Sequence, residues 1–281
     1  MTKRILLWAT VATITAATSL TIATPAHAVA GLEYPTAATA TNSSSPKSLT
    51  ITCPVGKSAI GGGAVVTGAT GDVTIRSIVP TRVGGTSYVS ISAEEDPDGF
   101  AGSWRIDGIA VCVTTPAGLS YVTASGGDPA LLWVTASCGA KRIIGSGYAV
   151  SHTAAAKATG VNPLSSNRAY LSVEPSRVAG AIVPITGTVI AVCATAALPG
   201  QSQVVVASVE NSVDGKGARA TCPAGKQVIG VGGDLYQFRA HTVIDDFTVI
   251  PSTNSASVIG YEDQAGNPDI WAVEATALCA T

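Results

Sequence analysis

Three tandem copies of a cysteine pair restrict the fold of this chain more than any other feature of its sequence. First cysteines are spaced by 85 and 84 residues, and second cysteines by 81 and 86 residues. We place repeats 1, 2 and 3 at residues 31–114, 118–195 and 200–281. Six cysteines allow fifteen connectivities, but an identical pair in each copy predicts one bridge within each copy. The predicted bridges are Cys53–Cys112, Cys138–Cys193 and Cys222–Cys279.

In each repeat the first cysteine is followed by a turn and a glycine cluster. Repeat 1 reads CPVGKSAIGGG from Cys53, repeat 3 reads CPAGKQVIGVGG from Cys222, and repeat 2 reads CGAKRIIGSG from Cys138. These strings lack the Lys-Ser/Thr ending of a phosphate loop, and no helix pattern follows them. We therefore expect the glycines to permit a β-bulge or a close strand crossing.

The composition predicts an all-β fold. Thirty glycines and fifteen prolines punctuate the chain, and β-branched residues outnumber strong helix formers. Many short strands with turns between them are expected, about five strands in each disulfide-bridged repeat. The linkers at 115–117 and 196–199 are too short for flexibly tethered domains. Two arrangements remain open: small sandwiches that pack together, or one pseudo-threefold, prism-like body.

The repeats resemble tandem modules of exported actinobacterial proteins of unknown function. The family signature is approximately CPxGKxxxGGG, then a proline, a tryptophan, and AxxCA near the end. Repeats 1 and 3 match it best, with Trp104 and Trp271 each eight residues before the closing cysteine. Repeat 2 lacks the early proline and the tryptophan. The resemblance implies export and carries no established activity.

The first 28 residues are typical of a secretory signal peptide. Lys3 and Arg4 precede an uncharged apolar stretch, and small residues in 26–28 occupy the positions that a signal peptidase reads. An uncleaved membrane anchor is the alternative, which the many threonines disfavour. We expect a secreted, extracellular protein with no membrane span after cleavage.

Charge and histidine content argue against several function classes. The 16 basic residues are scattered along the chain, so we expect neither a nucleic-acid partner nor a polybasic membrane patch. His152 and His241 stand at non-equivalent positions, and we expect both to be exposed. No Gly-x-Ser-x-Gly elbow occurs, and no cysteines have metal-ligand spacing. We predict no catalytic residue and no enzyme activity.

Two kinds of residue are candidates for ligand binding. Strand alternation places Trp104 and Trp271 on the face of the closing cysteine, which favours core packing over a ligand platform. Carboxylates gather in one loop of repeats 1 and 3, where they resemble weak oxygen ligands for Ca²⁺. The same residues are also ordinary turn formers. The candidate binding residues are Glu95, Asp96, Asp98, Glu262, Asp263 and Asp269, and repeat 2 has Arg177 in place of Asp96.

The sequence therefore predicts a non-catalytic secreted structural or recognition protein. A glycan or the cell envelope is the favoured ligand class, because loops on a rigid β scaffold are common binding sites. A secreted inhibitor or toxin-like partner protein is one alternative, and a hydrolase is another. The sequence defines neither the oligomeric state nor a cofactor beyond weak Ca²⁺.

Cleavage after Ala28 predicts that the exported protein begins at Val29. The intact mass of protein recovered from the medium should equal that of residues 29–281 with three disulfides. A mass equal to that of the full chain would contradict this assignment.

Overall fold

The computed structural model describes residues 29–128, 131–151, 156–165, 167–175, 185–236 and 241–281. The expected signal peptide lies outside these ranges. The described residues form β-strands joined by turns, with one short 3-10 turn, η2 (Pro251–Thr253), and no α-helix. Among them no helix is long and apolar enough to cross a membrane.

Each repeat contributes six strands, one more than expected, because the segment before the first-cysteine strand folds back onto the closing strand. Repeat 1 contains β1 (Thr36–Ala38), β2 (Lys47–Thr52), β3 (Lys57–Thr67), β4 (Val73–Val83), β5 (Thr86–Glu95) and β6 (Arg105–Thr114). Repeat 2 contains β7 (Ser120–Asp128), β8 (Leu132–Ser137), β9 (Arg142–Val150), β10 (Ala156–Ser165), β11 (Arg168–Pro175) and β12 (Ile185–Ala194). Repeat 3 contains β13 (Ser202–Ala207), β14 (Lys216–Thr221), β15 (Gln227–Tyr236), β16 (Thr242–Ile250), β17 (Ser255–Glu262) and β18 (Ala272–Ala280).

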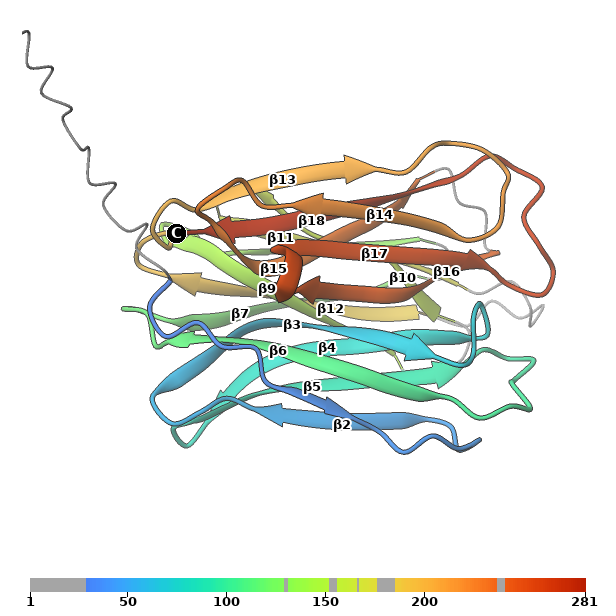
Figure 1. Cartoon of the computed structure of the whole chain (residues 1–281), viewed down its shortest axis with the longest axis horizontal. Helices are drawn as coiled ribbons and strands as arrows, with labels where there is room; N and C mark the ends of the chain where they lie inside the picture. The colour runs from blue at the N-terminus through green and yellow to red at the C-terminus, as the bar shows by residue number, and fades with distance from the viewer. Residues whose placement is uncertain (1–28, 129–130, 152–155, 166, 176–184, 237–240) are drawn as a thin grey trace, which may run out of the picture.

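The eighteen strands form three six-stranded sheets, and each sheet is shared by two repeats. Sheet I has the order β1-β6-β3-β16-β17-β14, sheet II the order β2-β5-β4-β9-β12-β7, and sheet III the order β13-β18-β15-β10-β11-β8. Adding six to every strand number, cyclically, converts one sheet into the next. The strands run side by side along the long axis of the molecule (Figure 1). Of the two arrangements left open by the sequence, the closed pseudo-threefold body is the one formed.

Neighbouring repeats are joined where a strand of one pairs with a strand of the next. β3 pairs with β16, β4 with β9, and β10 with β15, each over two residue pairs. A register shift lies beside each junction on the strands β4, β10 and β16. Such β-bulges bend a strand and increase its twist, which fits a sheet that turns from one repeat into another.

Glycines allow the repeats to approach closely, both where β9 of repeat 2 lies against β3 of repeat 1 and at the β3–β16 junction, as the sequence predicted. A Cβ added to Gly145 would lie 1.8 Å from the carbonyl oxygen of Ile60 in repeat 1. One added to Gly63 would lie 2.6 Å from the carbonyl oxygen of Phe247 in repeat 3. The expected bulge is also present, because the register shifts within the glycine clusters of β3 and β15.

Three equivalent hydrogen bonds connect the repeats in a ring. In each case a side chain near the start of one repeat donates to a backbone carbonyl at the start of a glycine-containing strand in another repeat. The bonds run from Tyr34 Oη to Val228 O, from Tyr121 Oη to Ala59 O (2.8 Å) and from Gln201 Nε2 to Ile143 O (2.7 Å). These bonds help to fix the position of each repeat against its neighbour.

The three predicted disulfides are confirmed, with Cα–Cα distances of 5.7, 5.6 and 5.7 Å. Cys53 follows β2 of sheet II, whereas Cys112 lies in β6 of sheet I. The bridge therefore joins the two halves of a repeat face to face across the core. No described cysteine is free, a pattern typical of proteins that mature in an oxidising environment.

The Gly145→Ala variant should unfold more easily than the parent protein, because the new Cβ cannot fit against Ile60 O. We expect a loss of about 3 kcal/mol in the free energy of unfolding, measured by urea denaturation. Gly217→Ala is the matched control, since the nearest atom to its added Cβ is 3.7 Å away. Equal effects of the two substitutions would contradict a packing role for Gly145.

Candidate functional site

Two of the candidate acidic residues accept hydrogen bonds from buried tryptophans. Glu95 Oε1 accepts a hydrogen bond from Trp104 Nε1 at 2.8 Å, and Glu262 Oε1 accepts one from Trp271 Nε1 at 2.9 Å. Both indoles are 0% exposed, which confirms the prediction of core packing. A buried N–H needs a hydrogen-bond partner. The structural role of these two carboxylates is therefore to accept the hydrogen bonds of the two indole N–H groups.

The other candidate carboxylates lie in turns. Asp96 Oδ1 accepts from Gly99 N, and Asp263 Oδ1 accepts from Ala265 N. Burial, together with the neighbouring charge of Asp98, raises the pKa of Asp96 to about 7. The backbone N–H of Asp269 donates to Asn267 Oδ1.

His241 has a partner that the sequence did not predict. Its Nδ1 lies 3.0 Å from Asp263 Oδ2, and its side chain is 31% exposed. His241 is therefore a partly buried member of a side-chain pair, where we expected an exposed residue. His152 and Arg177 lie outside the described residues.

The acidic side chains of the two loops, residues 95–98 and 262–269, do not gather into a cluster in the structure. Within the described ranges, no group of three or more His, Cys, Asp and Glu side chains is placed to hold a metal ion. The weak Ca²⁺ site that the sequence suggested in the loops of Asp96 and Asp263 therefore has no support in the geometry.

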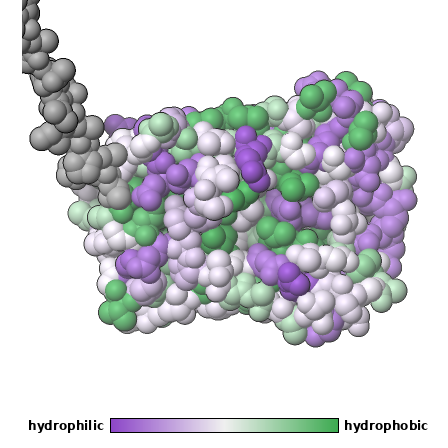
Figure 2. Space-filling model, viewed as in Figure 1, coloured by the Kyte–Doolittle hydropathy of each residue, from purple (hydrophilic) through white to green (hydrophobic). Residues whose placement is uncertain are grey.

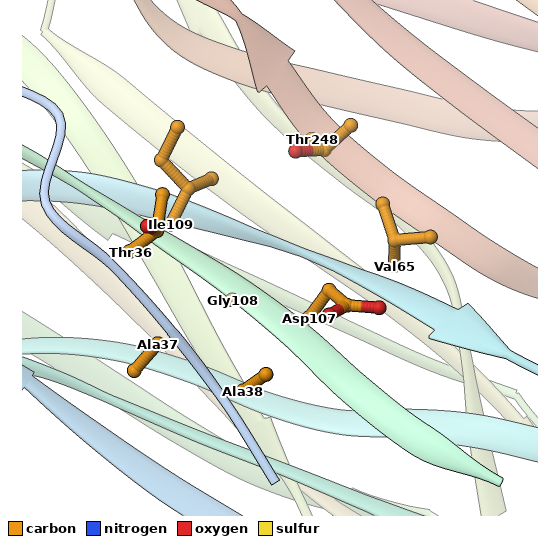
Figure 3. Close-up of a pocket in the computed structure, with 8 residues that line it drawn as sticks. All are labelled: Thr36, Ala37, Ala38, Val65, Asp107, Gly108, Ile109 and Thr248. Carbon is orange, nitrogen blue, oxygen red and sulfur yellow. The ribbon is translucent and has the colours of Figure 1, made fainter. Parts of the chain in front are cut away.

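A depression of about 340 Å³ lies on sheet I where repeats 1 and 3 meet. Hydrophilic and hydrophobic residues are interspersed on this side of the molecule (Figure 2). Asp107 is the charged residue of the lining, and its carboxylate already accepts from Arg105 and Thr67. The charged group of the depression is therefore already engaged in hydrogen bonds within the protein. Its lining consists of Thr36, Ala37, Ala38, Val65, Asp107, Gly108, Ile109 and Thr248 (Figure 3).

The outer face of sheet III, away from the hydrophobic core, carries an aromatic platform. In β8, Leu132 and Val134 are buried in the core, so alternation directs Trp133 to the opposite face. Trp133 is 62% exposed and stacks on Tyr170, with ring centroids 5.5 Å apart and an interplanar angle of 20°. An exposed, oriented indole is the kind of surface on which a flat ligand or a sugar ring stacks.

A polar centre lies beside this platform, at the junction of β10 and β15. An added Cβ on Gly160 would lie 1.7 Å from Asp234 Oδ1, and one on Gly232 would lie 2.0 Å from Asn162 Oδ1. The two glycines thus make room for two side chains that cross the junction in opposite directions. Asn162 Nδ2 donates to Asp234 Oδ2 at 2.9 Å.

Burial shapes the chemistry of this centre. Asn162 is 6% exposed, and its Oδ1 has no hydrogen-bond partner in the described part of the chain. Asp234 is 9% exposed, and burial raises the pKa of its carboxyl to about 7, against the bond from Asn162 that lowers it. The neighbouring Glu274 charge also raises this pKa. A partly neutral acid and an unpaired buried acceptor are typical of binding and catalytic sites.

Platform and polar centre lie in one row across the sheet. Trp133 is directly opposite Ser172, Ser172 opposite Gly160, Gly160 opposite Asp234, and Asp234 opposite Glu274. The Asp234 carboxylate lies over Gly160, which is two strands away from Trp133. Because neighbouring strands are about 4.8 Å apart, the carboxylate is about 10 Å from the backbone of Trp133. We call this site the Trp133 face; its residues are Trp133, Tyr170, Ser172, Asn162, Asp234 and Glu274.

The threefold arrangement supplies two internal comparisons for this row. Neither equivalent row contains an aromatic residue, and the sheet II row contains no charge. The sheet II row is Ser48, Ser92, Ser77, Ala149 and Thr188, and the sheet I row is Gly217, Ile259, Asp246, Val65 and Asp107. The combination of aromatic platform and polar centre therefore belongs to sheet III.

Sequence reasoning missed every residue of the Trp133 face. One signal was present: in the segment Leu132–Ser137 (LWVTAS) the tryptophan shares its parity with a threonine and a serine rather than with core residues. The pairing of Asn162 with Asp234 had no comparable signal, because it depends on contact between different repeats.

No protein-family model matches the chain, and no curated protein is similar to it. The resemblance of the repeats to exported actinobacterial modules stays a prediction.

Two aspartates at the sheet junctions, Asp234 and Asp246, predict an unusual dependence of stability on pH. The pKa of Asp234 is raised to about 7 and that of Asp246 to about 6, both by burial, from about 3.9 in an unfolded chain. Between these values the folded protein holds protons that the unfolded chain has lost, so stability falls as the pH rises. We expect a melting temperature a few degrees higher at about pH 5 than at about pH 8.

The Asp234→Asn variant tests the origin of this effect. It removes one titrating group, so the difference between the two melting temperatures should shrink. A parent protein that melts higher at the more alkaline pH would show that other groups dominate.

Proposed function

We propose that the protein is a secreted, non-catalytic recognition protein that binds glycans through the Trp133 face. The observation that carries the proposal is the 62% exposed Trp133, stacked on Tyr170 beside a buried polar centre. A sugar ring needs both an apolar surface for its C–H groups and polar groups for its hydroxyls. Exposed aromatic surface with adjoining polar groups is a common mark of a binding site.

Several observations support the secreted setting. Three disulfides suit an oxidising compartment, and the N-terminal sequence is typical of a signal peptide. A ring of disulfide-bridged repeats gives a rigid platform, which limits the entropy lost on binding. Polysaccharides of a cell envelope are ligands that such a protein would meet outside the cell.

The test is a glycan array probed with the mature protein, followed by titration of the strongest ligand against the Trp133→Ala variant. Because tryptophans at the centre of a binding site commonly contribute 2 kcal/mol or more, we expect affinity to fall by about tenfold or more. The folding of the variant should be unchanged, since the side chain is exposed.

Ser48→Ala is the matched control, because Ser48 occupies the equivalent position in sheet II. It should leave affinity unchanged. Absence of binding to every glycan, or full binding by Trp133→Ala, would sink the proposal.

A further inference from the structure

Sheet III ends at an open edge strand, β13. It pairs with β18 on one side, and no described strand pairs with its other side. Ser208 N donates to Val273 O, and the backbone groups of an antiparallel pair point alternately toward the partner strand and away from it. The backbone N–H and C=O groups of Gln203, Val205 and Ala207 therefore point to the open edge. Such a row of unpaired groups is a template for another strand.

The edge of β13 lacks the features that commonly protect edge strands, which are charges, prolines and short length. β1, the equivalent strand of sheet I, has three residues and follows Pro35. β7, the equivalent strand of sheet II, contains Gly126 and Gly127, which weaken a strand. Residues 201–208 (QSQVVVAS) contain no charge, proline or glycine. Of the three equivalent edges, β13 is therefore the one best suited to pair with a further strand.

β13 exposes apolar side chains on both of its faces. Val205 is 53% exposed and Val206 is 38% exposed, and consecutive residues of a strand point to opposite faces. A strand added at this edge therefore gains apolar contact on both faces. At the other edge of the sheet, β8 keeps Leu132 and Val134 buried, so its edge offers a partner only its outer face.

The exposed valines belong to repeat 3 alone. The pairing with the three closing strands aligns Val205 and Val206 with a threonine and an alanine in each of the other repeats, namely Thr36, Ala37, Thr123 and Ala124. Hydrophobic residues lie along the top of the molecule in Figure 2, where Figure 1 draws β13. The threefold arrangement does not require valine at these positions, which points to a separate role for the β13 edge.

The open edge is complementary to itself. The three residues that point outward are evenly spaced about Val205, so two copies of β13 can pair antiparallel about a two-fold axis. In this register Val205 is opposite Val205 of a second copy, and Gln203 is opposite Ala207 of a second copy. Each of these hydrogen-bonded pairs exchanges two bonds. On the reverse face, Val204 of one copy meets Val206 of the other. The paired strands contain no charge that would oppose the contact.

We propose that the protein forms a two-fold symmetric dimer in which the β13 strands of two copies pair and join their two copies of sheet III into one continuous sheet. This inference goes beyond glycan binding and does not depend on it. The two-fold axis of an antiparallel strand pair is perpendicular to the sheet, so the Trp133 faces of both copies lie on the same side of the dimer. Because pairing over one short strand makes a small interface, we expect reversible association in the micromolar range.

Sedimentation equilibrium of the mature protein across the micromolar range tests the dimer. The mass should rise from that of one chain to that of two chains as the concentration increases. Val205→Lys should stay monomeric, because it places two like charges directly opposite each other. Its folding should be unchanged, since the Val205 side chain is largely exposed. Thr36→Lys is the matched control at the equivalent position of β1, and it should dimerise like the parent protein.

A parent protein that sediments as one chain at every concentration would overturn the proposal. Dimerisation of Val205→Lys with the affinity of the parent protein would also overturn it, because the contact would then not include the β13 edge.

Cysteine variants test the register. The two Cα atoms of a hydrogen-bonded antiparallel pair are about 5.5 Å apart, a distance that a disulfide spans. Val205→Cys should therefore become a covalent dimer on mild oxidation, seen by non-reducing electrophoresis. In Ala207→Cys the two new residues are about 14 Å apart in the same register, so this variant should not be linked. Equal linking of the two variants, or no linking of Val205→Cys, would refute the pairing about Val205.

Discussion

At each of the three junctions, a strand of one repeat pairs with a strand of the next over two residue positions. Such short pairing holds only if the backbones fit closely, which is why Gly63 of β3 lies against the carbonyl of Phe247 in β16 without a side chain between them. The cross-repeat bonds from Tyr34, Tyr121 and Gln201 act on the same strands. A single repeat would expose the unpaired edges of its junction strands. The ring of three repeats is therefore the unit that satisfies the backbone.

The pairing between neighbouring repeats fixes the backbone in the same way in all three sheets. It does not determine which side chains the outer faces carry. The row that begins at Trp133 in sheet III begins at Ser48 in sheet II and at Gly217 in sheet I. All three rows cross the same kind of junction at the same register. Differences between them therefore reflect side-chain chemistry rather than backbone geometry. Sheet III departs most from its counterparts, and its departure lies in side-chain chemistry, which is where a function would reside.

Local and repeated patterns could be predicted from the sequence, whereas contacts between repeats could not. The bridges followed from an identical cysteine pair in each copy, and the burial of Trp104 followed from strand parity. The sharing of sheets depends on a few pairs such as Asp246 with Val65, far apart in the chain, and leaves no local periodicity. The sequence makes Glu95 a candidate ligand because it stands in a run of carboxylates. The need of a buried indole N–H for an acceptor is visible only when both are placed.

Repeat 2 differs from repeats 1 and 3 in the residues around the buried tryptophan, and this difference leaves the ring of three repeats unchanged. In repeat 1, Lys47 lies 4.7 Å from the ring of Trp104, whose N–H is satisfied by Glu95; Lys216, Trp271 and Glu262 form the same set in repeat 3. The register gives repeat 2 Leu132, Ile185 and Pro175 at these positions. Apolar residues at these positions need neither a hydrogen-bond acceptor nor a cation. Repeat 2 can therefore lack the glutamate and the lysine without leaving a polar group unsatisfied. With Leu132 packed inward, the next residue of β8 points outward. There repeat 2 places its tryptophan, on the surface and next to the polar centre shared with repeat 3.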